Sequence, residues 1–391
     1  MTSQKKQVSW IKKPEVQSII SSLLCIVVGL LIGYIVLLLI NPAGASEAIG
    51  AVMKNFLNYP SEIAQRKYLG NTLVKTAPLL MCALSVQFCY KVGLFNIGAA
   101  GQYTAGVCVC IYAALAWHMP WYICMILAAA AGALLGAITG ALKAYFNVNE
   151  VISGIMLNWI CLYVTNTILA NVKEAASPYT LGIASANPSA LIPTLGLDKL
   201  FGNNKYVTIA IPLAVIAAIM IWVILSKTKF GYELRATGFN KYAAKYAGMK
   251  EKKNIIITLV IGGMLAGIGA SFLYLTGFEQ WSCTQTSVPG MGFSGIAATF
   301  LGGLHPIGTI FASYFIQHIT SGGAYLDKAI YPSQISDLIS AIIIYLCGFA
   351  LFFKYSMNVR IAAREERTLE AQKQDEPPAA EAESKKGGEQ K

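Results

Sequence analysis

Amide and aromatic side chains interrupt otherwise apolar stretches of this sequence. The main amides inside such stretches are Asn96, Gln102, Asn158 and Asn166. Polar side chains are costly inside a membrane, so they mark either hydrogen bonds between helices or a path for a polar solute. Neutral amides and aromatic faces suit a neutral polar molecule better than an ion. Interhelical hydrogen bonding stays open as the alternative role for each of the candidate pathway residues, which are Phe95, Asn96, Gln102, Asn158 and Trp159.

The sequence contains no group of residues with the spacing of a hydrolase active site or a metal site. His118, His305 and His318 each stand alone in apolar surroundings, and the nine cysteines have no zinc-site spacing. The dipeptide Gly-Lys does not occur, so the chain lacks a Walker A phosphate loop. We therefore expect no catalytic residue, no metal and no cofactor on this chain. If ATP drives its work, ATP and magnesium belong to a separate polypeptide.

Ionisable groups inside apolar stretches would favour an ion-coupled carrier. Lys75, Glu150 and Asp337 are the candidates, but all three lie near the ends of the expected spans rather than at their middles. A proton or ion relay needs groups near the middle of the bilayer. An ion-coupled carrier is therefore kept as the less favoured alternative.

The composition indicates an integral membrane protein. Of the 391 residues, 55% are hydrophobic and 13% are charged, whereas about a quarter are charged in ordinary globular proteins. The apolar runs approach 20 residues, the length of a membrane-spanning helix, and lack the alternation of barrel strands. The sequence therefore predicts an all-α, polytopic bundle of about ten transmembrane helices. The expected spans are residues 19–40, 72–90, 94–117, 121–141, 151–170, 207–225, 255–275, 290–304, 306–322 and 335–353.

Basic residues predict the orientation of the bundle. An even number of spans puts both termini on the same side of the membrane. If that side is the cytoplasm, 14 basic residues before the tail lie on the cytoplasmic side and seven lie on the outer side. This asymmetry follows the positive-inside rule. We expect a cytoplasmic N-terminus over 1–18, a membrane domain over 19–354, and a cytoplasmic tail over 355–391. The tail's composition is typical of disorder.

A polar segment at 227–253 lies between two expected spans and contains residues typical of the start and the end of a helix. Asn240 is a plausible N-cap and Gly248 a plausible left-handed stop. The small residues between them recur at helical spacing, which predicts a short helix with a nearly bare face beside an aromatic stripe. Such a face suits docking into a groove of another protein, and an ordinary loop is the alternative. The residues on this face are Asn240, Ala243, Ala244, Ala247 and Gly248.

Four motifs resemble one family of transporters. They read GYELRATGFN at 231–240, GLFNIG at 93–98, NEVISGIMLNW at 149–159 and GFSGIA at 292–297. The first resembles the ATPase-coupling loop of ABC-importer permeases, and the set is most similar to the nucleoside and simple-sugar branch, related to the ribose and branched-chain amino acid permeases. Members often read GAEGQ where this chain reads GAAGQ at 98–102, so no role is assigned to that glutamate.

The resemblance implies the permease subunit of an ATP-driven importer for nucleosides, in the cell membrane. It also implies a separate ABC ATPase, a second permease that is a paralogue or a copy, and an extracytoplasmic substrate-binding lipoprotein. Within the coupling loop it adds Gly231, Glu233 and Arg235 to the docking residues. Uptake of ribose-type sugars or branched-chain amino acids is the alternative.

Two further patterns concern packing. Gly132, Gly136 and Gly140 recur every four residues, which permits close approach of another helix. The GLFNIG and GFSGIA motifs open two spans that enter the membrane from opposite sides. They predict an inverted repeat that relates spans 2–5 to spans 7–10.

Overall fold

The computed structural model describes residues 14–326 and, beyond them, residues 330–331, 338–339, 341–342, 345–346, 349, 352–353, 355–356, 358–360 and 363. Within these residues the protein is helical, with two isolated β-bridges and no strand. The predicted all-α class is confirmed. The main helices of the bundle are α1 (Pro14–Ile40), α3 (Glu62–Lys91), α4 (Ala99–Leu115), α5 (Trp121–Phe146), α6 (Glu150–Leu169), α9 (Ala210–Lys227), α12 (Glu251–Tyr274), α13 (Gly290–Leu301) and α14 (Pro306–Gly322).

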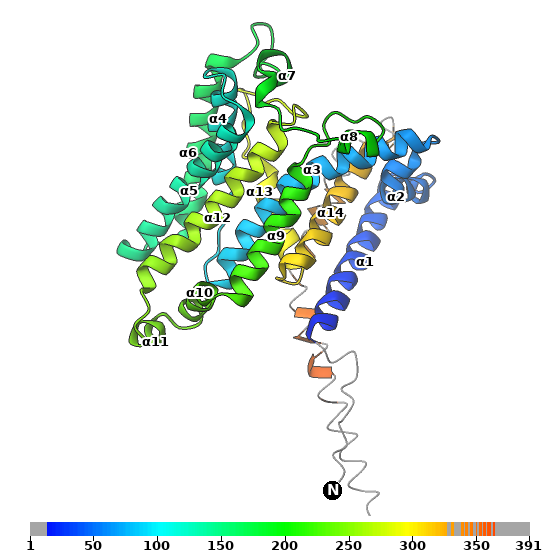
Figure 1. The fold of residues 1–391 in the computed structure, drawn as a ribbon. Coiled ribbons are helices and arrows are strands. Elements are labelled where there is room, and N and C mark those ends of the chain that lie inside the picture. The colour runs from blue at the N-terminus through cyan, green and yellow to red at the C-terminus, as the bar shows by residue number, and fades with distance from the viewer. Residues whose placement is uncertain are drawn as a thin grey trace, which may run out of the picture.

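Short helices gather at the two ends of the bundle. Figure 1 shows α2 (Ala45–Lys54), α7 (Ile183–Ala186) and α8 (Leu197–Leu200) at one end. At the opposite end lie α10 (Lys229–Phe239) and α11 (Lys241–Tyr246). These three short helices come from two connecting segments, one between α1 and α3 and one between α6 and α9, whereas the other end is dominated by the 227–253 loop.

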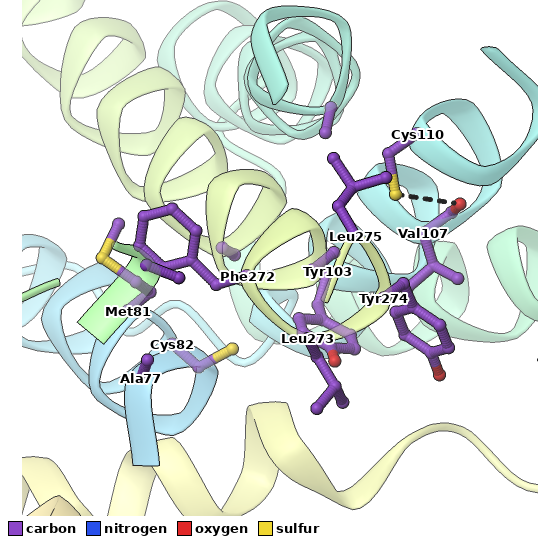
Figure 2. Close-up of a cluster of buried hydrophobic side chains, with 14 of the residues drawn as sticks. Ala77, Met81, Cys82, Tyr103, Val107, Cys110, Phe272, Leu273, Tyr274 and Leu275 are labelled. Carbon is purple, nitrogen blue, oxygen red and sulfur yellow. Dashed lines mark hydrogen bonds between the residues drawn. The ribbon is translucent and has the colours of Figure 1, made fainter. Parts of the chain in front are cut away.

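The centre of the bundle is the packing of α3, α4 and α12. Figure 2 shows Met81 of α3, Tyr103 of α4 and Phe272 of α12 among the buried side chains that meet there. Apolar side chains on α1 and α6 are instead widely exposed, as expected for helices that face lipid. Six described helices are long and apolar enough to cross a membrane, and α4 and α13 are shorter apolar helices.

Glycines allow α5 and α12 to approach closely. A Cβ added at Gly263 of α12 would collide with the backbone carbonyl of Gly132, and one at Gly136 would collide with that of Leu259. Neither helix could keep this spacing with larger residues. The structure thus confirms that the Gly132, Gly136 and Gly140 stripe is a helix-packing surface, and it identifies α12 as the partner.

Helices α3 and α4 pack against α12 and α13 in a reciprocal pattern. Helix α4 packs on α12, α13 packs on α3, and α3 packs on α12. Gly106 of α4 lies against Gly267 of α12, and Gly295 of α13 lies against Cys82 of α3. An inverted repeat produces this reciprocal arrangement, so the packing supports the predicted relation for these two helix pairs.

Several expected boundaries differ from the structure. The third span was expected from residue 94, but α4 begins at Ala99: Gly93 has a left-handed backbone (φ 77°), and residues 94–96 are not helical. The segment 43–70, a mixed polar stretch between two expected spans, contains α2 and the first turns of α3. Hydropathy marks only the apolar part of a helix, and α3 continues past it. Residues 171–206, which lie between two expected spans, include α7 and α8.

Some predictions fall on residues that the structure does not describe. Most of the tenth span at 335–353 and of the 355–391 tail lies outside the described residues, as do 1–13. The count of ten spans and the domain boundaries therefore stay predictions. Helix α13 has 12 residues, about 18 Å at the standard rise, which is too short to cross a hydrocarbon core of about 30 Å alone.

Candidate functional site

Helix α10 begins directly after α9 through a side-chain cap. The Thr228 hydroxyl accepts a hydrogen bond from the Gly231 N–H at 3.0 Å and donates one to the Ile224 carbonyl at 2.6 Å. Gly231 is buried against Ile224 and Leu225. The turn from the membrane helix into the 227–253 loop is therefore fixed by local hydrogen bonds.

Helix α11 has the two ends that the sequence predicts. The Asn240 side chain accepts from the N–H groups of Tyr242 and Ala243, at 3.0 and 3.1 Å. At the other end Gly248 has φ 80°, its N–H donates to the Lys245 carbonyl, and the Met249 N–H donates to the Ala244 carbonyl. This pair of bonds is a Schellman motif.

The exposed surface of this loop differs from the bare face that was expected. Ala243, Ala247 and Gly248 are exposed, but Ala244 is only 4% exposed. The Schellman motif commonly brings its outer residue, here Met249, onto the residue at the position of Ala244. Ala244 therefore packs within its own chain and is not available to a partner in this conformation.

Aromatic side chains dominate the exposed part of the loop instead. Phe239 and Tyr246 are each 93% exposed, and Tyr242 is also exposed. The sequence indicated this stripe but assigned docking to the small residues beside it. Large exposed aromatic rings are typical of interface anchors.

The loop is joined to the bundle by buried contacts on α10. The Asn254 side chain of α12 donates to the Thr237 hydroxyl at 2.8 Å. Gly238 lies directly against Val92 and Gly93 at the turn between α3 and α4, where a Cβ would collide with the Val92 carbonyl. A displacement of α10 therefore acts on α12 and on the α3–α4 turn together.

Two charged residues of the loop are half-buried on α10. Glu233 uses its backbone carbonyl to accept from the Thr237 hydroxyl at 2.8 Å. The Nε atom of Arg235 is buried and has no hydrogen-bond partner among the described residues. A buried donor without a partner is costly, so this atom is an unfavourable feature of the loop in the described part of the chain.

The structure brings Asn96, Gln102 and Asn158 together where α3, α4 and α6 meet. The Asn96 Nδ2 atom donates to the Gln102 Oε1 atom at 2.8 Å and to the Ser85 hydroxyl at 3.0 Å. The Gln102 Nε2 atom donates back to Asn96 Oδ1 at 3.2 Å. Asn158 Oδ1 accepts from the Gly101 N–H at 2.7 Å, and its Nδ2 atom donates to the Ile97 carbonyl at 3.1 Å.

These hydrogen bonds give every side-chain amide nitrogen and oxygen of the three residues a partner, and all three residues are buried. The geometry therefore favours interhelical bonding for Asn96, Gln102 and Asn158. Trp159 lies apart from them on an exposed face of α6, stacked on Tyr163 at 6.3 Å between ring centroids. Phe95 is half-buried in the α3–α4 turn.

The Asn166 side chain also makes hydrogen bonds that hold two segments of the protein together. Its Oδ1 atom accepts from the Trp281 indole N–H at 2.9 Å, and its Nδ2 atom donates to the Gln285 carbonyl at 2.8 Å. Asn166 thereby ties α6 to the loop that precedes α13.

A cavity that the sequence did not predict lies at the end of the bundle opposite α10 and α11. Its volume is about 320 Å³, and its walls come from the segment after α2, the start of α3, the end of α14 and the loop after α12. Tyr59, Tyr68 and Tyr325 form an aromatic wall: Tyr59 stacks on Tyr68 at 4.1 Å and meets the edge of Tyr325 at 5.6 Å. We call this cavity the tyrosine pocket.

The rest of the tyrosine pocket is lined by Lys75, Phe278 and Ala324 and by uncharged polar groups. These polar groups include the amides of Asn71 and Gln317 and the hydroxyl of Ser321. Burial raises the pKa of the phenols of Tyr59 and Tyr325 above the ordinary value for tyrosine, so both are neutral donors at physiological pH. No single apolar run or motif contains these residues, which come from four separated segments, so no sequence pattern identified them.

The charged candidates for ion coupling are paired where the structure describes them. Lys75, which lines the tyrosine pocket, forms an ion pair with Glu279 at 2.9 Å, and Glu150 pairs with Lys143 at 2.7 Å. Asp337 lies outside the described residues. Within the described part of the chain, no three His, Cys, Asp or Glu side chains are grouped to hold a metal ion.

The chain is similar to several characterised permeases. It is 33% identical over 342 residues, 86% of this chain and 94% of the relative, to the guanosine ABC transporter permease protein NupP of Bacillus subtilis. It is 31% identical over 341 residues, 84% of this chain and 90% of the relative, to the nucleoside ABC transporter permease protein NupB of Lactococcus lactis. A second guanosine permease of Bacillus subtilis, NupQ, is 32% identical over 254 residues, 62% of this chain and 77% of the relative. No solved structure matches the chain.

The family comparison covers most of the membrane domain. Residues 68–348 match the family described as branched-chain amino acid transport system, permease component. This range contains the capped 227–253 loop, the amide cluster, helices α4, α12 and α13, and most of α3. The chain is a multi-pass membrane protein and belongs to this family of ABC-importer permeases.

Proposed function

We propose that this chain is the permease subunit of an ATP-driven importer that takes up nucleosides across the cell membrane. Its relatives NupP and NupB are named as guanosine and nucleoside permeases and align over most of both chains, which is the observation that carries the substrate class. The chain itself binds no cofactor in this proposal. A separate ATPase binds ATP and magnesium.

Three partners follow from the proposal. The chain's similarity to both NupP and NupQ supports pairing with a second, paralogous permease. An extracytoplasmic binding lipoprotein delivers the nucleoside, and the ATPase docks on α10 and α11. The basic residues of the 227–253 loop support placing this end, and both chain termini, in the cytoplasm.

Coupling works through the contacts of α10. Movement of the ATPase displaces Phe239 and Tyr246, and α10 transfers the displacement through Thr237 to Asn254 of α12. Gly238 transfers it to the α3–α4 turn, which leads directly into the amide cluster around Asn96. The proposal assigns the amide cluster a role in holding α3, α4 and α6 together during this movement.

Uptake of a radiolabelled nucleoside in cells with and without the gene tests the proposal. We expect uptake to require the gene, to be competed by unlabelled nucleosides, and to be unaffected by leucine or ribose. Competition by leucine would indicate an amino acid permease. Competition by ribose alone would indicate a sugar permease. Either result would refute the proposed substrate class.

A further inference from the structure

Exposed apolar side chains gather beside the tyrosine pocket, at the end of the bundle that the proposed orientation places outside. Leu195 is 78% exposed, Ile63 is 68% exposed and Leu200 is 65% exposed. Ile63 lies against the segment that follows Leu200, since a Cβ added at Gly202 would lie 2.7 Å from the Ile63 carbonyl oxygen. We call Ile63, Leu195 and Leu200 the outer ridge. Apolar side chains that gather on one surface are typical of a contact with another molecule.

Leu195 has an unfavourable backbone conformation at the tip of a turn. Its φ is 46°, in the left-handed region that bulky residues rarely adopt, and Gly196 follows with φ 87°. The Leu197 N–H donates to the Thr194 carbonyl at 3.0 Å and closes this turn. Strain of this kind costs free energy and is typical of functional sites. The turn therefore presents an apolar side chain to the outside at a cost in stability.

The outer ridge and the tyrosine pocket share the first turns of α3. The Asn204 Nδ2 atom donates to the Asn71 Oδ1 atom and to the Lys67 carbonyl, both at 2.8 Å. Asn71 also lines the pocket. Tyr206, two residues after Asn204, meets the edge of Phe278 in the pocket wall at 5.2 Å between ring centroids. A raised apolar surface and a cavity are therefore fixed side by side.

The tyrosine pocket has the chemistry to receive a side chain from a protein partner. Its aromatic wall and uncharged polar groups suit an apolar or amide side chain, and the charge of Lys75 is compensated by Glu279 at 2.9 Å. Its volume of about 320 Å³ holds a bulky side chain. Anchor residues of protein interfaces typically occupy such pockets. The pocket lies at one end of the bundle, so its occupant reaches it without crossing the membrane.

The surface around the outer ridge is basic. Lys67, Lys199 and Lys205 are exposed and form no ion pair within the part of the chain that the structure describes. Lys67 lies against Gly202, and Lys199 and Lys205 flank the same segment. Asp198 is half-buried beside them. A partner that carries carboxylates around its apolar contact residues complements this surface.

We propose that the outer ridge and the tyrosine pocket form the docking surface for the extracytoplasmic binding lipoprotein. A side chain of the lipoprotein inserts into the pocket, the ridge packs against an apolar part of its surface, and its carboxylates face the lysines. This inference rests on the proposed function and on the orientation that places this end outside. It deepens that function by naming where the lipoprotein binds.

Docking at this surface acts directly on α3. This helix has 30 residues, about 45 Å at the standard rise, and its first turns carry Asn71 of the pocket wall. Its other end leads into Val92 and Gly93, which lie against Gly238 of α10. The lipoprotein and the ATPase therefore contact opposite ends of one helix in this proposal. Stimulation of ATP hydrolysis by the lipoprotein is accordingly a second readout of docking.

Two variants test the docking surface. Leu195→Asn removes the apolar side chain, and asparagine tolerates the left-handed backbone better than leucine does. Ala324→Trp occupies the tyrosine pocket from an exposed position in its wall. The probe is the soluble part of the lipoprotein that supports nucleoside uptake with this permease, and its affinity is measured for the whole transporter in nanodiscs. We expect each variant to weaken binding about tenfold, while Leu195→Asn leaves the melting temperature equal or higher.

Matched controls make these changes elsewhere at the same end of the bundle. Ala184→Trp adds the same ring on α7, which lies beside α4 in Figure 1, and Tyr122→Asn replaces an exposed ring on α5. Both should keep normal affinity. Charge is tested by Lys199→Glu and by added salt, each of which should weaken binding of the lipoprotein.

The outcomes separate this inference from the proposed function. Unchanged affinity in either Leu195→Asn or Ala324→Trp is the result expected of a surface that touches only lipid headgroups, and it would overturn this inference alone. Nucleoside uptake by the unmodified transporter is measured separately. Its absence would overturn the proposed function together with this inference.

Discussion

The exposed rings of Phe239 and Tyr246 give the sharpest test of ATPase docking. Both side chains are 93% exposed at the end of the bundle formed by α10 and α11. If they anchor the ATPase, truncation to alanine weakens the complex without disturbing the membrane bundle. Ala244→Glu is a poorer test, because Ala244 is buried within this chain and its replacement would also disrupt α11.

The size of the effect follows from the area of each ring. An aromatic side chain of this kind buries at least about 150 Å², which corresponds to about 4 kcal/mol at ~25 cal/mol per Å². Ordering of the interface reduces this gain, and truncation of an anchor residue typically costs ~2 kcal/mol or more. Each single variant should therefore weaken ATPase binding about 30-fold, since ~1.4 kcal/mol corresponds to a factor of ten.

Binding of the purified ATPase to the permease in nanodiscs measures this effect, with substrate-stimulated ATP hydrolysis as a second readout. Lys241→Ala and Tyr122→Ala are the controls: the first removes a charge beside the rings, and the second removes an exposed ring from another part of the molecule. Both should bind the ATPase within a few-fold of the unchanged protein. Normal affinity in both Phe239→Ala and Tyr246→Ala would refute the docking surface.

Two other predictions concern packing and orientation. Gly263→Ala should destabilise the protein by about 1–3 kcal/mol, because its Cβ collides with the Gly132 carbonyl, whereas Gly50→Ala should be neutral because nothing lies within 4 Å; thermal unfolding in detergent compares the two. Equal melting temperatures would contradict the close packing of α5 and α12. A single cysteine at Ser185 should react with an impermeant maleimide added from outside, whereas one at Ser226 should react only after permeabilisation. Labelling of both from one side would contradict the proposed topology.

Local signals in the sequence predicted the two ends of α11 well. The Asn240 cap and the Gly248 stop depend on a few consecutive residues, so their residue types suffice to place them. The burial of Ala244 could not be predicted in the same way. Its burial depends on how the chain folds back after Gly248, which helical spacing alone does not describe.

The role of the amides could not be decided from the sequence. An amide in an apolar helix looks the same whether it bonds a neighbouring helix or a solute. The reciprocal bonds between Asn96 and Gln102 appear only when the α3–α4 turn and α4 are both placed. The tyrosine pocket is a stronger example, because its walls come from segments separated by more than 200 positions between Tyr68 and Gln317.

ATP-driven nucleoside accumulation in proteoliposomes tests the central claim most directly. The vesicles contain this permease, its second permease and the ATPase, and the binding lipoprotein and labelled guanosine are added on the side of the tyrosine pocket. We predict that guanosine accumulates only with ATP and magnesium on the side of α10 and α11, and that ionophores which collapse proton and sodium gradients have no effect. Accumulation that needs an ion gradient and proceeds without ATP would contradict the account and would instead identify an ion-coupled carrier.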